Sequence, residues 1–247
     1  MVAINACVQD GVSPRTLKRV SRLLSPCPEF DLCLPRSTDR LDVTNYIAGQ
    51  FRRAHQAEIH DFMPALLTMR CQAHITAVAG IRPAAQSRLF LENYLDTTVE
   101  TKLGKRVGEP VTREGIVELG NLVSTEGGAS QLLFLLLTGL LHSAGFSWAT
   151  FTATLQVRKG VERLGLKLHT LCPADPARLE GSQQSDWGSY YDSKPMVYAS
   201  SVKAALSRLT RSRLHAALLG LLQQRIQVLT PLLQTGQPLV STRAFTA

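Results

Sequence analysis

Two charged side chains lie inside apolar stretches of this sequence. Glu118 stands between Val117 and Leu119, and Arg82 is followed directly by Pro83. A carboxylate buried without a partner is costly, and burial raises its pKa toward the range that a general base needs at neutral pH. Glu118 is therefore predicted to deprotonate or orient a nucleophile. The structural alternative is an ion pair with Arg82.

The guanidinium of Arg82 could bind a substrate carboxylate with two parallel hydrogen bonds. It could equally pair with Glu118 or with Glu92. Glu92 has a second interpretation, because Asp96 and Glu100 follow it at intervals of four residues. Such spacing places the three acids on one face of a helix, where they bind a substrate or are simply solvated.

A run of small residues joins a strand-like segment to a helix-like one. Residues 124–130 read Ser-Thr-Glu-Gly-Gly-Ala-Ser and lead directly into the apolar stretch 131–144. Small side chains let backbone N–H groups approach an anion, and a helix N-terminus adds partial positive charge. The segment predicts phosphate binding by Gly127, Gly128, Ala129 and Ser130. The alternative is a tight connection that binds nothing.

Hydrophobic periodicity predicts the elements that position these groups. Asp42 is a plausible helix cap, and Gly165 suits the left-handed end of a helix. The layout is mixed α/β. We expect helices at residues 42–60, 131–144, 157–164 and 200–233, a hairpin of strands 65–71 and 74–82, and strands at 116–123, 146–154, 166–171 and 196–199.

Composition excludes several classes of protein. The chain has 247 residues, 45% of them hydrophobic, and a formal net charge of +8, so it can bury a core and favours an acidic partner. The longest apolar run, residues 132–141, is too short to span a bilayer. Five cysteines without a short repeated spacing predict reduced thiols in a cytoplasmic protein. Neither a metal-binding pattern nor a nucleic-acid-binding motif is present, and we expect no metal ion and no nucleic acid.

The order of strand, Gly-rich turn, helix, strand and helix resembles the GNAT acyltransferase fold. A narrower resemblance is to the acyl-homoserine-lactone synthases, which carry Gly-x-x-Arg-Leu-x-Pro and then Trp-Glu-x-Ser-Arg. This chain reads Ala-Gly-Ile-Arg-Pro at residues 79–83 and Val-Glu-Leu-Gly-Asn at residues 117–121. Arg82 and Glu118 match that pattern, whereas Gly120 and Asn121 replace its Ser-Arg.

The chain is most similar to the thermostable hemolysin family of bacterial proteins, over about residues 43–200. Five segments resemble its motifs in order: Phe90–Asp96, Val117–Leu122, Phe151–Thr154, Ala174–Pro176 and Trp187–Tyr191.

These resemblances imply an α+β fold with a GNAT-like central sheet flanked by helices. They also imply an N-terminal extension (residues 1–40), an acyltransferase domain (41–200) and a C-terminal helical segment (201–247). The implied activity is transfer of an acyl group from an acyl-carrier-protein or acyl-coenzyme A thioester to a small amine, such as an amino acid or amino alcohol. The thioester is a co-substrate, and no cofactor is permanently bound.

The same resemblances imply roles for individual residues. Glu118 and Tyr191 are the catalytic candidates, with the tyrosine hydroxyl protonating a leaving thiolate. Arg82, Glu92 and Trp187 would bind substrate. The donor would lie on the turn and on Asn121, Leu122, Val123 and Ser124, where splayed strands admit pantetheine. For Asn121 the alternative is a hydrogen bond at a strand end, and for the aromatic residues it is packing among themselves.

The C-terminal helical segment is basic and rich in leucine. It could contact an anionic membrane surface, dock an acidic carrier protein, or pack on the domain or on a second subunit in an oligomer. Two other functions remain open: a membrane-active hemolysin, as the family name implies, and a non-catalytic GNAT-like protein that binds an acyl carrier.

Overall fold

A seven-stranded mixed sheet forms the centre of the protein in a computed structural model that describes residues 20, 24–25, 28–125, 129–179 and 186–235. The strand order is β1-β2-β3-β4-β5-β7-β6. All neighbours are antiparallel except β4 and β5, which run parallel. The strands are β1 (Glu29–Cys33), β2 (Ala65–Cys71), β3 (His74–Pro83), β4 (Ile116–Ser124), β5 (Trp148–Ala153), β6 (His169–Pro173) and β7 (Met196–Ser201).

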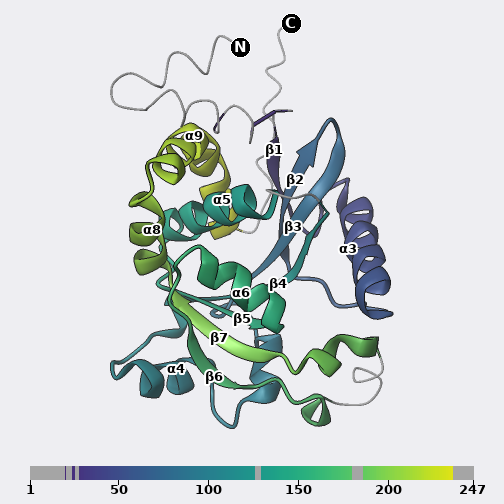
Figure 1. Cartoon of the computed structure of the whole chain (residues 1–247). Helices are drawn as coiled ribbons and strands as arrows, with labels where there is room; N and C mark the ends of the chain where they lie inside the picture. Colours follow the sequence, from purple (N-terminus) through teal and green to yellow (C-terminus); the bar gives the residue numbers. More distant parts are fainter. Residues whose placement is uncertain (1–19, 21–23, 26–27, 126–128, 180–185, 236–247) are drawn as a thin grey trace, which may run out of the picture.

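Helices cover both faces of this sheet (Figure 1). On one side α5 packs against α8 and α9, and on the other α3 packs against β3 and β4. The α-helices are α3 (Arg40–His55), α4 (Val99–Val107), α5 (Ala129–Ser143), α6 (Leu155–Arg163), α8 (Val202–Thr210) and α9 (Arg213–Thr235). Four short 3-10 helices complete the described chain: η1 (Phe90–Tyr94), η2 (Arg113–Gly115), η3 (Pro176–Arg178) and η4 (Gly188–Ser193).

The central helix α5 is apolar on nearly every side because it is enclosed. Leu133, Leu135 and Leu141 point in different directions around the helix axis and are all buried. A helix that is hydrophobic all round belongs in a protein core or a membrane. Among the described residues, no helix combines the length and hydropathy needed to cross a bilayer. The apolar surface of α5 is covered instead by the sheet, α8 and α9.

The sequence predicted most of these elements correctly. The hairpin of β2 and β3 is confirmed to within a residue, and Gly165 adopts the left-handed conformation expected after α6 (φ 76°). The helix expected at residues 42–60 begins earlier, at Arg40, so that Asp39 holds the cap position predicted for Asp42, which lies in the first turn. It also ends earlier, because Gln56 turns left-handed (φ 55°) and ends α3. The α+β class is confirmed.

Regular structure begins within the N-terminal extension predicted for residues 1–40. Strand β1 pairs with β2 from Glu29 opposite Arg70 to Cys33 opposite Leu66, so part of segment 1–40 belongs to the sheet. At the other end of the chain, α9 packs on α5 and on β1. Both segments that were assigned outside the acyltransferase domain therefore contribute to one hydrophobic core. The three-part division of the chain stays a prediction.

Two glycines on adjacent strands make room for one methionine. A Cβ atom on Gly80 would lie 2.6 Å from Cγ of Met63 and 3.0 Å from the carbonyl oxygen of Gly120. We expect Gly80→Ala to lower the free energy of unfolding by about 1–3 kcal/mol, because overpacking moves Met63 or the strand. Chemical denaturation measures the change. The control is Gly49→Ala in α3, where no atom lies within 4 Å of the new Cβ; an equal loss in both variants would contradict the steric explanation.

Candidate functional site

Strand β4 contains a β-bulge at its centre. Val78 pairs with Val123 and Gly80 pairs with Gly120, so Ala79 alone faces two residues of β4. One of the two is Asn121, whose φ of 46° is left-handed. Asparagine tolerates this conformation better than most residues. The bulge interrupts the ladder between β3 and β4 and re-aims the backbone of β4.

The same strand separates from its other neighbour just beyond this point. Strands β4 and β5 pair at four positions, from Ile116 opposite Trp148 to Leu119 opposite Phe151. Each strand then continues without the other, β4 to Ser124 and β5 to Ala153. The splayed strands expected around residues 122–124 are therefore present. Backbone groups that would normally join the two strands line a gap in the sheet.

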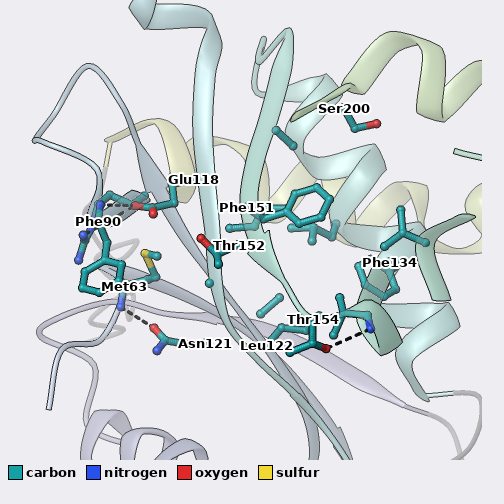
Figure 2. Close-up of a pocket in the computed structure, with 18 of the residues that line it drawn as sticks. Met63, Phe90, Glu118, Asn121, Leu122, Phe134, Phe151, Thr152, Thr154 and Ser200 are labelled. Carbon is teal, nitrogen blue, oxygen red and sulfur yellow. Dashed lines mark hydrogen bonds and ion pairs between the residues drawn. The ribbon is translucent and has the colours of Figure 1, made fainter. Parts of the chain in front are cut away.

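A cavity of about 280 Å³ passes through this gap. In Figure 2 Glu118 lies on one side of the strands, while Phe151 and Phe134 lie on the other. The side of Glu118 is polar and aromatic. The opposite side is an apolar chamber lined by α5, α6 and α8, through residues that include Leu137, Leu141, Val157, Val161 and Ala205.

Glu118 is the buried carboxylate of this cavity, with only 3% of its side chain exposed. Its Oε2 accepts the N–H of Phe90 at 2.9 Å, and its Oε1 accepts the N–H of Leu91 at 2.8 Å. Burial raises the pKa of Glu118 to about 7, although the two N–H groups and Arg82 act in the opposite direction. A carboxyl group with this pKa exchanges protons readily near neutral pH.

Arg82 lies between two acids. Its Nη1 is 3.8 Å from Oε2 of Glu118, and its Nη2 is 3.2 Å from Oδ2 of Asp61. The ion pair with Glu118 that the sequence left open is therefore present, whereas the alternative pairing with Glu92 is not. Sequence reasoning missed Asp61, which follows α3 in a loop and carries no periodic signal. Asp61 is 65% exposed and lines the cavity entrance beside Arg82.

Aromatic rings form the wall around Glu118. Trp187 has its ring centroid 5.2 Å from that of Tyr190 and 5.7 Å from that of Phe90. The hydroxyls of Tyr191 and Tyr94 are 2.5 Å apart. Burial raises the pKa of Tyr191 to about 12, although the bond with Tyr94 acts against this. The hydroxyl is therefore protonated at neutral pH and can donate a hydrogen bond.

The wall is held by a close backbone contact with α3. Gly188 has a positive φ of 50°, and a Cβ there would collide with the carbonyl oxygen of His55. The neighbouring Ser189 donates its hydroxyl to the same oxygen at 3.2 Å. The sequence predicted Trp187 and Tyr191 as site residues. It did not predict Tyr94, which reaches the same wall from η1.

The structure does not bring Glu92 to the cavity. Glu92 is 7% exposed, and its oxygens accept the N–H groups of Leu89 and Val99 as well as Nη1 and Nη2 of Arg113. Burial alone would raise the pKa of Glu92, but these bonds outweigh it and hold the pKa at about 2. The substrate-binding role expected for Glu92 has no geometric support, because no lone pair is directed at the cavity.

The expected donor-binding residues are divided by the geometry. Asn121 and Leu122 line the cavity. Oδ1 of Asn121 accepts the N–H of Met63 at 2.8 Å, so the hydrogen bond that was the alternative to donor binding for this residue is present. Val123 packs in the core against α3, and Ser124 is exposed at the strand end. Gly127 and Gly128 lie outside the described residues. Ala129 and Ser130 form the first turn of α5.

Within the described parts of the chain, no group of three or more His, Cys, Asp or Glu side chains is arranged to hold a metal ion.

Comparisons with known proteins agree with this architecture. A family model described as "Thermostable hemolysin" matches residues 34–206. Among solved structures, the acyl-homoserine lactone synthase LasI superimposes with a TM-score of 0.50 at 14% identity, covering 72% of this chain and 94% of LasI. FeeM, an N-acyl amino acid synthase from uncultured soil microbes, gives a TM-score of 0.50 at 11% identity, covering 73% of this chain and 95% of FeeM. No curated protein matches. The expected GNAT-like fold of the lactone synthases is confirmed.

Proposed function

This chain belongs to the thermostable hemolysin family, and on that premise we propose that it is an acyltransferase that moves an acyl group from a thioester to a small amine. One observation supports the proposal above all others. A buried carboxylate with a pKa near 7 stands beside a gap in the sheet that leads to an apolar chamber. Such a site places its own base, Glu118, next to a bound amine and leaves the apolar chamber for the acyl chain of the donor.

The donor would enter through the gap between β4 and β5. Unpaired backbone groups of the two strands can bond the amides of a pantetheine arm, and the chamber between α5, α6 and α8 can bury the acyl chain. The donor phosphate would then lie toward Ser124 and the N-terminus of α5, the two ends of the small-residue segment 124–130. Acyl-coenzyme A and an acyl carrier protein both present an acyl thioester on a pantetheine arm that carries a phosphate.

The acceptor would lie on the aromatic side of the strands. The Glu118 carboxylate removes a proton from the acceptor ammonium, and the freed amine attacks the thioester carbonyl carbon. The C–N bond forms and the C–S bond breaks. The thiolate takes a proton from the Tyr191 hydroxyl, and the phenolate so formed takes the second proton that the nitrogen loses on becoming an amide. A thioester needs little activation once the reactants are aligned, so positioning supplies most of the acceleration.

Arg82 and Asp61 would select the acceptor at the cavity entrance. Their pairing offers one cation and one anion at the cavity entrance, which is the pattern that the carboxylate and ammonium of an amino acid can meet. An amino alcohol could meet the same pair with its hydroxyl and its ammonium. LasI and FeeM, by their descriptions, synthesise an acyl-homoserine lactone and N-acyl amino acids, and both products join an acyl group to an amine.

Ligand-dependent unfolding tests the proposal. The protein is heated alone and with coenzyme A, long-chain acyl-coenzyme A, holo-carrier and acyl-carrier protein, and the stabilising donor is then incubated with a panel of amines and analysed by mass spectrometry. A donor at 100 times its dissociation constant should add about 2.7 kcal/mol of stability. We expect an acylated donor to stabilise more than its deacylated form. No stabilisation by any donor, together with binding to anionic vesicles, would overturn the proposal and favour a membrane-active protein.

A further inference from the structure

Arg113 uses all of its hydrogen-bond donors on one segment of the chain. Its Nε donates to the carbonyl oxygen of Ala84 at 2.8 Å, and its Nη2 donates to that of Ser87 at 3.1 Å. Nη1 and Nη2 also bond the two oxygens of Glu92, at 2.7 and 2.9 Å, and Nη1 bonds Oε2 of Glu100 at 2.9 Å. A guanidinium has five N–H donors, and here five bonds use them.

The carboxylate of Glu92 connects Arg113 to further backbone groups of the same segment. It accepts the N–H of Leu89 at 2.9 Å and that of Val99 at 3.0 Å, which fixes both ends of the loop that contains η1. The pair is largely shielded from water, with Glu92 7% and Arg113 25% exposed. A bidentate, buried ion pair with additional backbone bonds holds a geometry that isolated surface pairs do not.

The backbone held in this way is the one that binds the proposed base. The N–H groups of Phe90 and Leu91, immediately after Leu89, donate to the two oxygens of Glu118. Arg113 also lies in η2, which leads directly into β4 and Glu118. It therefore fixes the start of the strand that carries the carboxylate and the loop that holds the carboxylate from the other side.

We infer that Arg113 is a positioning residue for Glu118, acting through Glu92 and the backbone of residues 89–91. The inference rests on the proposed function, in which Glu118 is the base. Arg113 is not expected to touch substrate, because it does not line the cavity. The local sequence does not mark Arg113 as part of a site, since this arginine stands in a polar segment with other charged residues.

The position of this backbone affects the proton affinity of Glu118. The N–H groups of Phe90 and Leu91 lower the pKa of the carboxyl against the effect of burial. The other charged or titratable groups around it are Arg82 from β3, Asp61 from the loop after α3 and Tyr94 from η1. None of these three is bonded to Arg113. Displacement of the loop should therefore raise the Glu118 pKa, while the contributions of Arg82 and Asp61, which lie outside this loop, persist.

The test compares Arg113→Lys and Arg113→Ala with the wild-type protein. The matched control is Arg88→Lys, which changes an exposed arginine in the same segment. Glu118 is titrated by ¹³C NMR of the side-chain carboxyl carbon without any substrate, and Glu118→Gln identifies its signal. Lysine carries three donors on one nitrogen and cannot reproduce the five bonds, so the titration midpoint should rise by roughly one pH unit in Arg113→Lys. Arg88→Lys should leave it unchanged.

Steady-state kinetics complete the test with the donor and amine found for the wild-type protein. We expect kcat to fall about 10- to 100-fold in both Arg113 variants with a smaller change in the KM for the amine. Added guanidinium ion should restore part of kcat to Arg113→Ala.

The outcomes separate the two claims. An unmoved Glu118 midpoint in folded Arg113→Lys would overturn the positioning role and leave the acyltransferase proposal standing. A raised midpoint in a protein that transfers no acyl group would support the structural coupling and overturn the proposed function. Loss of folding in Arg113→Ala shifts the decision to the lysine variant.

Discussion

Replacing Glu118 with glutamine is expected to lower the rate of acyl transfer by about 10²- to 10⁴-fold, the range typical of a lost general base. Glutamine keeps the shape of the side chain but cannot take a proton from the acceptor ammonium. Rates with the donor and amine identified for the wild-type protein measure the effect. The matched control is Glu109→Gln, which changes an exposed glutamate in the loop before η2.

The pH dependence of the rate gives this prediction a second readout. Because the pKa of Glu118 is raised to about 7, the base is protonated and inactive below that pH, so the wild-type rate should increase as pH rises through 7 and then level off. Glu118→Gln should lose this rise. A folded Glu118→Gln protein with wild-type rates, or one that retains the same acid limb, would exclude Glu118 as the base.

Filling the apolar chamber is expected to change which acyl chains the protein accepts. Ala205 is a buried residue of α8 that lines the chamber, and Ala205→Phe would place a ring where a long chain ends. Each CH₂ group that loses its buried position forfeits about 0.8 kcal/mol, so excluding four of them should lower kcat/KM for a tetradecanoyl thioester by roughly 100-fold or more. A butanoyl thioester should react at a nearly unchanged rate.

The neighbouring residue supplies the control for this substitution. Ala204 is exposed on the same helix, and Ala204→Phe adds the same ring without entering the cavity. Thermal unfolding should show that both variants remain folded. Equal activity of Ala205→Phe on long and short donors would contradict an acyl role for the chamber.

Local chemistry explains what the sequence could predict. Two strand-like segments, residues 65–71 and 74–82, separated only by Gln72 and Ala73, specify a hairpin, and the leucines of α5 specify a buried helix. Both patterns depend on neighbours within a few positions. Glu118 and Arg82 were found because a charge in an apolar strand is conspicuous. The pairing of β3 with β4 then places Arg82 directly opposite Glu118.

The remaining parts of the site depend on distant residues. Strand β1 lies among prolines, and pairing with β2, about 40 positions further on, makes it a strand. Glu92 seemed suited to substrate because its acidic neighbours suggested a helix face, whereas the structure ends η1 at Tyr94 and directs Glu92 toward Arg113. Asp61 and Tyr94 reach the cavity only through tertiary packing, and nothing in their local sequence distinguishes them.

The separation of β4 and β5 has a consequence for folding. It divides the sheet into two antiparallel blocks, β1 to β4 and β5-β7-β6, that share four register positions. The hairpin of β2 and β3 closes a two-residue loop and should form early. The other strand pairs join residues more than 20 positions apart and should form later, and among them the seam between β4 and β5 has only four paired positions. Amide hydrogen exchange should be faster along the seam than within either block. A molecule lying in the gap would bind both blocks, and would therefore strengthen the part of the sheet where the fold is weakest.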